Sequence, residues 1–181
     1  MTFCAQYMRQ VAGLIQSIDP VAFEAATALL RRAGGAKVML AGNGASAAIA
    51  SHIAVDLTKI SGIRAMTFNE PDLITCFAND FGYEHWVAKA LEHYADAGDA
   101  VVLISSSGRS PNIVNAAAQA RTMGLPLLTL SGFAPDNPLR AAGAVNLWVN
   151  SDRYNLVEVT HQAWLVAMVD ALAGVVMDAS A

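Results

Sequence analysis

The sequence predicts a three-layer α/β/α sandwich on a five-stranded parallel sheet, of the flavodoxin-like kind, with helices at the N-terminus. Short apolar segments alternate with helix-like segments of a dozen or so residues, which is typical of parallel strands joined by crossover helices. A length of 181 residues suits one domain, and a hydrophobic share of 55% can supply its core. We expect a helical arm over about 1–34 and an α/β core over about 35–181.

The arm consists of two amphipathic segments, 4–17 and 20–33, that read as helices. Gly34 and Gly35 follow the second segment, and glycine commonly ends a helix. The apolar segment 37–41 then predicts the first strand of the sheet.

The middle of the chain continues the alternation. An alanine-rich helix is expected over about 47–60 and a second strand over 63–68. A short helix over 72–79 and a longer one over 83–97 come next. Residues 99–104 form the clearest buried strand, because five apolar residues follow one another without interruption.

The C-terminal part completes the sheet. Pro111 suits the first position of a helix, so we expect that helix over about 111–123, followed by strands at 125–130 and 144–149. A long apolar helix over about 155–177 closes the chain. It is apolar nearly all round from Trp164 to Val176, which requires burial on all sides and predicts packing between subunits.

Composition excludes several classes of function. The net charge is −4 and the 11 basic residues form no cluster, which excludes nucleic-acid binding through phosphate neutralisation. The most apolar segment, 163–177, is interrupted by Asp170 and is shorter than the roughly 20 residues of a membrane span. No signal-peptide pattern opens the chain, and Cys4 and Cys76 form no disulfide framework. We therefore expect a cytoplasmic protein.

A serine-rich loop follows the clearest strand. Residues 105–110 read Ser-Ser-Ser-Gly-Arg-Ser and lead into a helix. Four hydroxyls and the backbone N–H groups of a helix N-terminus favour an anion such as a phosphate monoester. The Gly-Lys-Ser/Thr ending of a nucleotide-binding P-loop is missing.

A second loop, Gly42-Asn-Gly-Ala-Ser46, follows the first strand. In parallel sheets ligands bind beyond the carboxyl ends of the strands, so both loops are expected to border one pocket. Taken alone, this loop is as compatible with a tight turn as with a ligand site. Glu70 lies too far along the chain to bind a ribose after Gly42, which disfavours a nucleotide cofactor.

The two loops, in this order, resemble those of the SIS (sugar isomerase) domain, and within it the phosphoheptose isomerase family. The likeness rests on 42–46, His52 and Asp56, 78–82, 104–112 and a polar cluster opening the last helix. The resemblance implies an aldose–ketose isomerase that converts sedoheptulose 7-phosphate to a manno-heptose 7-phosphate, with zinc and a homotetramer whose subunits share active sites. It also implies an alternative, a non-catalytic SIS module that binds a sugar phosphate and regulates or assists a protein partner.

The resemblance also implies roles for single residues. The phosphate would contact the serine loop, through Ser105, Ser106, Ser107 and Ser110. The sugar chain would contact residues of two other segments, namely Asn43, Gly44, Ser46, Asn79 and Asp80.

Isomerisation requires a base that moves a proton between C1 and C2, and an electropositive group beside the oxygen. His52 and Asp56 share one helix face at a spacing of four residues, and Glu158 and His161 do so at a spacing of three. The catalytic candidates are Asp56, Glu158 and His161. If the two helices meet, His52, Asp56, Glu158 and His161 are the candidate ligands of a tetrahedral zinc ion.

The chain departs from the family pattern in its acid–base residues. Asp56 stands where the family has a longer glutamate, and Glu158 stands where it has a metal-binding glutamine. The family's second catalytic histidine falls on Leu165 or Val166, both apolar. The phosphate loop is intact, and the loss of that histidine is what supports the non-catalytic alternative.

Overall fold

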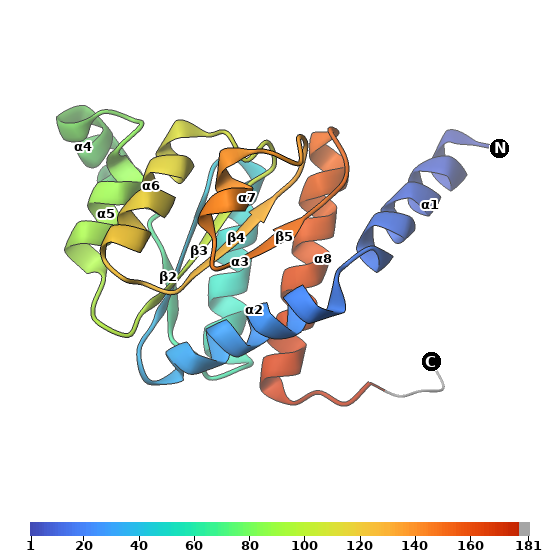
Figure 1. The fold of residues 1–181 in the computed structure, drawn as a ribbon, viewed down its shortest axis with the longest axis horizontal. Coiled ribbons are helices and arrows are strands. Elements are labelled where there is room, and N and C mark those ends of the chain that lie inside the picture. The colour runs from blue at the N-terminus through green and yellow to red at the C-terminus, as the bar shows by residue number, and fades with distance from the viewer. Residues whose placement is uncertain (178–181) are drawn as a thin grey trace.

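Five parallel strands form the centre of the computed structural model, which describes residues 1–177 (Figure 1). The strands are β1 Val38–Gly42, β2 Ala65–Thr67, β3 Ala100–Ser105, β4 Leu127–Ser131 and β5 Val145–Trp148. Their order in the sheet is β2-β1-β3-β4-β5, so the connections reverse direction between β1 and β3. The predicted flavodoxin-like sandwich is confirmed. Residues 178–181, the end of the expected core segment, lie outside the described residues.

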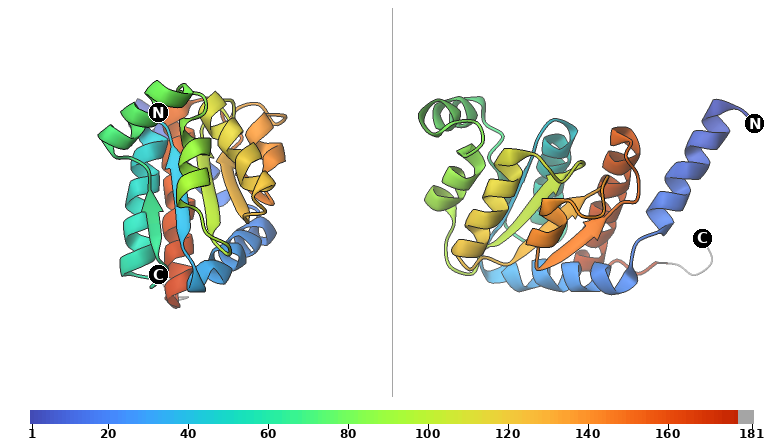
Figure 2. Two further views of the ribbon diagram at one scale, coloured as in Figure 1. Left: turned by 90° about the vertical axis from the view of Figure 1, so that its left-hand side faces the viewer. Right: turned by 45° about the horizontal axis from the view of Figure 1, so that its top comes forward.

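Helices cover both faces of the sheet (Figures 1 and 2). The helices are α1 Phe3–Gln16, α2 Pro20–Arg32, α3 Ala45–Lys59, α4 Pro71–Phe81, α5 Trp86–Tyr94, α6 Pro111–Thr122, α7 Pro138–Ala142 and α8 Tyr154–Ala173, with a 3₁₀ turn at Ala33–Gly35. One apolar cluster joins the sheet to α2, α3 and α8, and a second joins the other face to α5, α6 and α7. Neighbouring residues of β3 alternate between the two clusters, since successive side chains of a strand point to opposite faces.

Several elements differ from the expected boundaries. The edge strand β2 has three residues rather than the six expected over 63–68. Helix α5 begins at Trp86 rather than near residue 83, because Gly82 ends α4 at a φ of 84° and a turn follows. Helix α7 is a further element that was not predicted, and its start is set by Asn137 as the N-cap before Pro138.

Helix α8 is shorter than expected, because Gly174 adopts the left-handed conformation that ends a helix. Trp164, Leu165 and Met168 are buried, but Val176 is 90% exposed, so all-round burial does not extend to the end of the expected segment. Among residues 1–177, α8 is the helix with the length and apolar composition of a membrane span, and 44% of its most apolar window is buried inside this fold.

Helix α1 projects away from the sandwich and contributes no buried residue (Figure 2). Phe3 and Met8 on this helix are 75% and 59% exposed. Trp164 of α8 ties the corner between α1 and α2 to the body, since its indole N–H donates to the carbonyl oxygen of Ile15 at 2.9 Å.

Candidate functional site

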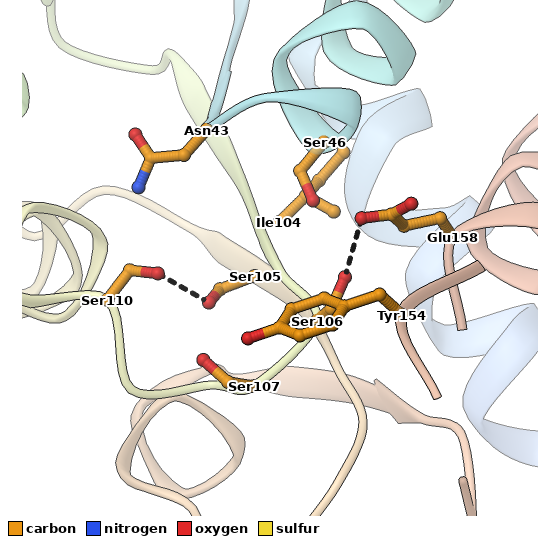
Figure 3. Close-up of a pocket in the computed structure, with 9 residues that line it drawn as sticks. All are labelled: Asn43, Ser46, Ile104, Ser105, Ser106, Ser107, Ser110, Tyr154 and Glu158. Carbon is orange, nitrogen blue, oxygen red and sulfur yellow. Dashed lines mark hydrogen bonds between the residues drawn. The ribbon is translucent and has the colours of Figure 1, made fainter. Parts of the chain in front are cut away.

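A pocket lies beyond the carboxyl ends of β1 and β3, where the strand order reverses, as expected for a parallel sheet (Figure 3). Its walls come from both predicted loops and from the start of α8. The lining residues are Asn43, Ser46, Ile104, Ser105, Ser106, Ser107, Ser110, Tyr154 and Glu158.

The four serines of the loop after β3 all border this pocket. The hydroxyls of Ser105 and Ser110 lie 3.1 Å apart, which closes the loop on itself. Ser110 is the N-cap of α6, yet its side chain makes no capping hydrogen bond to the helix. Hydroxyls that do not bond to the helix, next to its positive end, are suited to a phosphate group.

Glycine is required within this loop, because Gly108 has a φ of 64° and a side chain there would collide with Asn137. Asn137 is fully buried and holds the neighbouring loop together by donating to the carbonyl oxygens of Gly132 and Ala134. The backbone N–H of Leu139 donates to the carbonyl oxygen of Gly108 at 3.1 Å. The segment after β4 therefore packs against the serine loop at Gly108 and holds it in place. This support was not predicted from the sequence, although an asparagine before proline is an N-cap signal.

The loop after β1 turns tightly at two glycines. Gly44 has a φ of 55°, and a Cβ on Gly42 would lie 2.7 Å from backbone and side-chain atoms of Ser46. This turn brings Ser46, which is 3% exposed, to the pocket wall. Gly44 itself is not a lining residue; it shapes the turn, and its contact with a ligand stays a prediction.

Asn43 is held by two side chains from other elements. Its amide forms a reciprocal pair with the amide of Asn112 on α6, with both hydrogen bonds at 2.9 Å. The hydroxyl of Tyr83 donates to the Asn43 Oδ1 at 3.2 Å. Asn112 is 1% exposed, so this pairing takes place in a nearly dry environment.

Asn79 and Asp80 do not line the pocket, so their contact with a sugar stays a prediction. Both are exposed on the last turn of α4, and the Asn79 amide donates to Asp80 at 2.9 Å. Helix α4 stands at the outer edge of the fold against α5, away from the serine loop (Figure 1).

Glu158 enters the pocket from the first turns of α8 (Figure 3). It accepts a hydrogen bond from the Ser106 hydroxyl at 3.5 Å, and it is the carboxylate among the lining residues. The start of α8 also brings Tyr154, whose ring packs edge-on against Phe133 with the centroids 4.8 Å apart. Tyr154 was not predicted from the sequence, because its place in the pocket wall depends on how α8 packs against the rest of the fold.

His52 lines a neighbouring groove between α3 and α8 but not the pocket itself, and Asp56 lines neither of them. Glu158 lines this groove too, together with His52 and Gln162. The His52 Nε2 lies 3.0 Å from Asp56 Oδ2, and the Gln162 amide lies 2.8 Å from His52 Nδ1. Because an amide nitrogen only donates, Nδ1 accepts and Nε2 carries the proton toward Asp56. Gln162 escaped sequence reasoning, although it follows Glu158 by one turn.

His161 does not reach the pocket, which corrects its expected catalytic and metal-binding roles. It is completely buried on the core side of α8, and its Nε2 donates to the carbonyl oxygen of Ser131 at 3.1 Å. The four residues expected to bind zinc therefore do not converge. Within residues 1–177 no group of three or more His, Cys, Asp or Glu side chains is placed to hold a metal ion. The donor set of this chain does not fit the expected tetrahedral site.

The buried His161 predicts a loss of stability in acid. Burial lowers its pKa to about 4, although the hydrogen bond to Ser131 acts in the opposite direction. The unfolded chain takes up a proton below about pH 6.5, whereas the folded chain does not until about pH 4, so unfolding becomes easier as the pH falls. We expect the free energy of unfolding to fall by about 2 kcal/mol between pH 7.5 and pH 5 on this account.

Urea unfolding at the two pH values measures this difference, and His161→Gln serves as the control because its amide can still donate to Ser131. The variant is expected to lose the His161 part of the pH dependence. An equal pH dependence in both proteins would contradict the burial of a neutral histidine.

A comparison with protein-family models matches residues 6–132 to the SIS domain, a span that contains both loops of the pocket. A curated phosphoheptose isomerase from Fusobacterium nucleatum is 38% identical over 103 residues, 54% of this chain and 53% of that protein. One from Pectobacterium atrosepticum is 38% identical over 65% of this chain and 62% of that protein. The chain thus spans between half and two thirds of the length of these relatives.

Other relatives match over more of their length. A phosphoheptose isomerase from a Bradyrhizobium species is 34% identical over 85% of this chain and 79% of that protein. Among solved structures, a phosphoheptose isomerase from Neisseria gonorrhoeae superposes with a TM-score of 0.84 at 26% identity, covering 93% of this chain and 94% of that one. The structural similarity extends beyond the segment matched by the family model.

Proposed function

The chain belongs to the SIS domain family, in the branch of the phosphoheptose isomerases, and from that premise we propose that it is an aldose–ketose isomerase of sugar phosphates. The observation that carries the proposal is the position of Glu158, a carboxylate 3.5 Å from a serine of the phosphate loop. A phosphate-binding loop holds the substrate by the end that does not react. A carboxylate beside it can then act on the carbon chain.

The substrate that fits the relatives is a seven-carbon ketose phosphate, sedoheptulose 7-phosphate. The phosphate would bind the hydroxyls of the serine loop and the N-terminus of α6, as a dianion at a positive helix end. The sugar chain would run from there past Ser46 and Asn43 toward α8.

In this scheme Glu158 carries the proton. Its carboxylate takes a proton from C1 of the ketose, the electron pair of that C–H bond forms the C1=C2 double bond, and the C2 oxygen gains a proton to give an enediol. Return of the carried proton to C2, with loss of the proton on the C1 oxygen, yields the aldose. Asp56 is less well placed, because it lies outside the pocket and is paired with His52. Since the expected zinc ligands do not converge within residues 1–177, the scheme assigns no step to a metal ion.

We extend the proposal to a cytoplasmic homotetramer. The 14 residues of α1 include no buried one, which leaves this amphipathic helix available for another copy. Asn79 and Asp80 are exposed away from their own pocket, where a neighbouring subunit's pocket could use them. Two exposed free cysteines agree with a reducing compartment.

The proposal predicts conversion of sedoheptulose 7-phosphate by the purified protein. Proton NMR in D₂O would follow the aldose signal and the entry of deuterium at C1 and C2, which proton transfer through an exchanging carboxylate requires. Heat-denatured protein is the control. Tight binding without conversion or exchange would contradict the isomerase proposal and favour the non-catalytic SIS module.

A further inference from the structure

We propose that Asn112 and Tyr83 are positioning residues that orient the amide of Asn43, so that Asn43 offers the ligand an N–H donor and no acceptor. The inference rests on the proposed function, because the ligand in question is the sugar chain of a bound sugar phosphate. Neither residue is a neighbour of Asn43 in the sequence: Asn112 belongs to α6, and Tyr83 lies in the turn after α4.

The hydrogen-bond inventory of Asn43 carries the argument. Its carbonyl oxygen has two lone pairs, and the Asn112 amide and the Tyr83 hydroxyl take one each, at 2.9 and 3.2 Å. Its amide nitrogen has two hydrogens, and one of them is given to the Asn112 Oδ1 at 2.9 Å. Within residues 1–177 the second hydrogen has no recorded acceptor, while Asn43 lines the pocket. A ligand therefore meets an N–H group at this place.

Rotation of the amide by 180° would undo this arrangement at a cost. The reciprocal pair with Asn112 would then face oxygen to oxygen and nitrogen to nitrogen unless Asn112 rotated as well. Asn112 is 1% exposed, so no water would compensate for the lost hydrogen bonds. In the orientation that the structure shows, the Tyr83 hydroxyl donates to the Asn43 Oδ1 and adds a third hydrogen bond to the amide.

The chemical consequence is selectivity for an oxygen acceptor on the sugar. A carbonyl oxygen fits this place, and the bond strengthens if negative charge develops on that oxygen as the enediol forms. Because Asn43 follows β1 and Asn112 belongs to the first turn of α6, the pair also fixes the distance between this donor and the phosphate loop. Both effects act on the sugar end of the ligand and not on the phosphate.

Binding measurements distinguish an effect on the sugar part of the ligand from an effect on its phosphate. Isothermal titration in the Glu158→Gln background, which prevents turnover, would use sedoheptulose 7-phosphate and inorganic phosphate as ligands. We expect Asn43→Ala and Asn112→Leu each to weaken sugar-phosphate binding about 10-fold, the effect of one lost or misdirected hydrogen bond. Binding of inorganic phosphate should stay within about 2-fold. Tyr83→Phe, which removes a single hydroxyl, should weaken sugar-phosphate binding about 3-fold.

A double-mutant cycle tests whether Asn112 acts through Asn43. The double variant Asn43→Ala with Asn112→Leu should bind sugar phosphate no more weakly than Asn43→Ala alone, because there is no amide left to orient. Asn115→Leu is the matched control on the same helix, since the Asn115 amide bonds to the carbonyl oxygen of Glu84 and does not line the pocket. It should leave both ligands unaffected.

The outcomes distinguish the inference from the proposed function. If the protein with Asn43 and Asn112 both intact binds sugar phosphate no more tightly than inorganic phosphate, the proposed function fails. If that preference exists but Asn112→Leu retains it, or lowers the affinity for both ligands equally, or adds to Asn43→Ala, the positioning role is refuted. Should Asn112→Leu not fold, judged by its melting temperature, Tyr83→Phe decides, and full retention of the preference would refute the inference.

Discussion

Replacing Glu158 by glutamine is expected to lower kcat about 1000-fold, because loss of a proton-carrying group costs between two and four orders of magnitude. Glutamine has the same shape and its oxygen still accepts from the Ser106 hydroxyl, so the pocket keeps its geometry. Substrate binding should not weaken. It should tighten, since the carboxylate that repels a phosphate dianion is gone. Steady-state kinetics by NMR gives kcat, and titration with inorganic phosphate gives the change in affinity.

Asp56→Asn is the matched control for this prediction. Asp56 is the other carboxylate considered as a proton carrier, but it is paired with His52 and lines neither the pocket nor the neighbouring groove. Its replacement should lower kcat by less than 10-fold or so, through the altered orientation of His52. The reverse result, an inactive Asp56→Asn and an active Glu158→Gln, would transfer the proton-carrying role to Asp56.

Replacing Ser106 and Ser110 together by alanine is expected to raise KM about 100-fold and to leave kcat within a few-fold. Each hydroxyl supplies a hydrogen bond to a charged group, worth roughly 1.5–3 kcal/mol, and two such losses exceed a factor of one hundred. The reacting carbons lie at the other end of the substrate, so the loss should appear mainly in KM, and kcat should fall only through the lost hydrogen bond from Ser106 to Glu158. The measurements are initial rates over a wide range of substrate concentration and titration with inorganic phosphate.

Thr122→Val serves as the control for the serine variant, because Thr122 ends the same helix α6 and its hydroxyl only returns to the carbonyl oxygen of Ala118. It should not change KM. Unaltered kinetics and phosphate affinity in the serine variant would show that the phosphate binds elsewhere, for example at Arg9 and Arg153 beside α1.

The serine loop could be predicted from sequence because all of it lies in one continuous segment. Strand, loop and helix start follow each other there, and the carboxyl end of a parallel strand has a known place in the fold. The partners that hold the site, Asn112, Asn137 and Gln162, could not be predicted. Their contacts join elements far apart in the chain. Asn137 carries a local N-cap signal before Pro138, but that signal does not indicate its place beside Gly108 of the serine loop, and nothing local distinguishes Asn112 and Gln162 from ordinary polar residues of a helix.

The orientation of α8 shows the same limit in detail. Relative to Glu158, a residue three positions later is turned by about 60° to one side and a residue four positions later by about 40° to the other. Spacing alone therefore allowed either His161 or Gln162 to face α3. Packing decides between them: the side of α8 with His161 and Trp164 is buried in the core, and the side with Glu158 and Gln162 borders the ligand groove.

Because α8 is fixed in the core through its buried side, the residues of its exposed side can change without moving the serine loop. Binding of the phosphate and conversion of the sugar can therefore change independently during evolution. A single substitution at Glu158 would turn a catalyst into a receptor that still captures its metabolite, and a protein of this architecture can acquire a sensory task without having to evolve a new binding site.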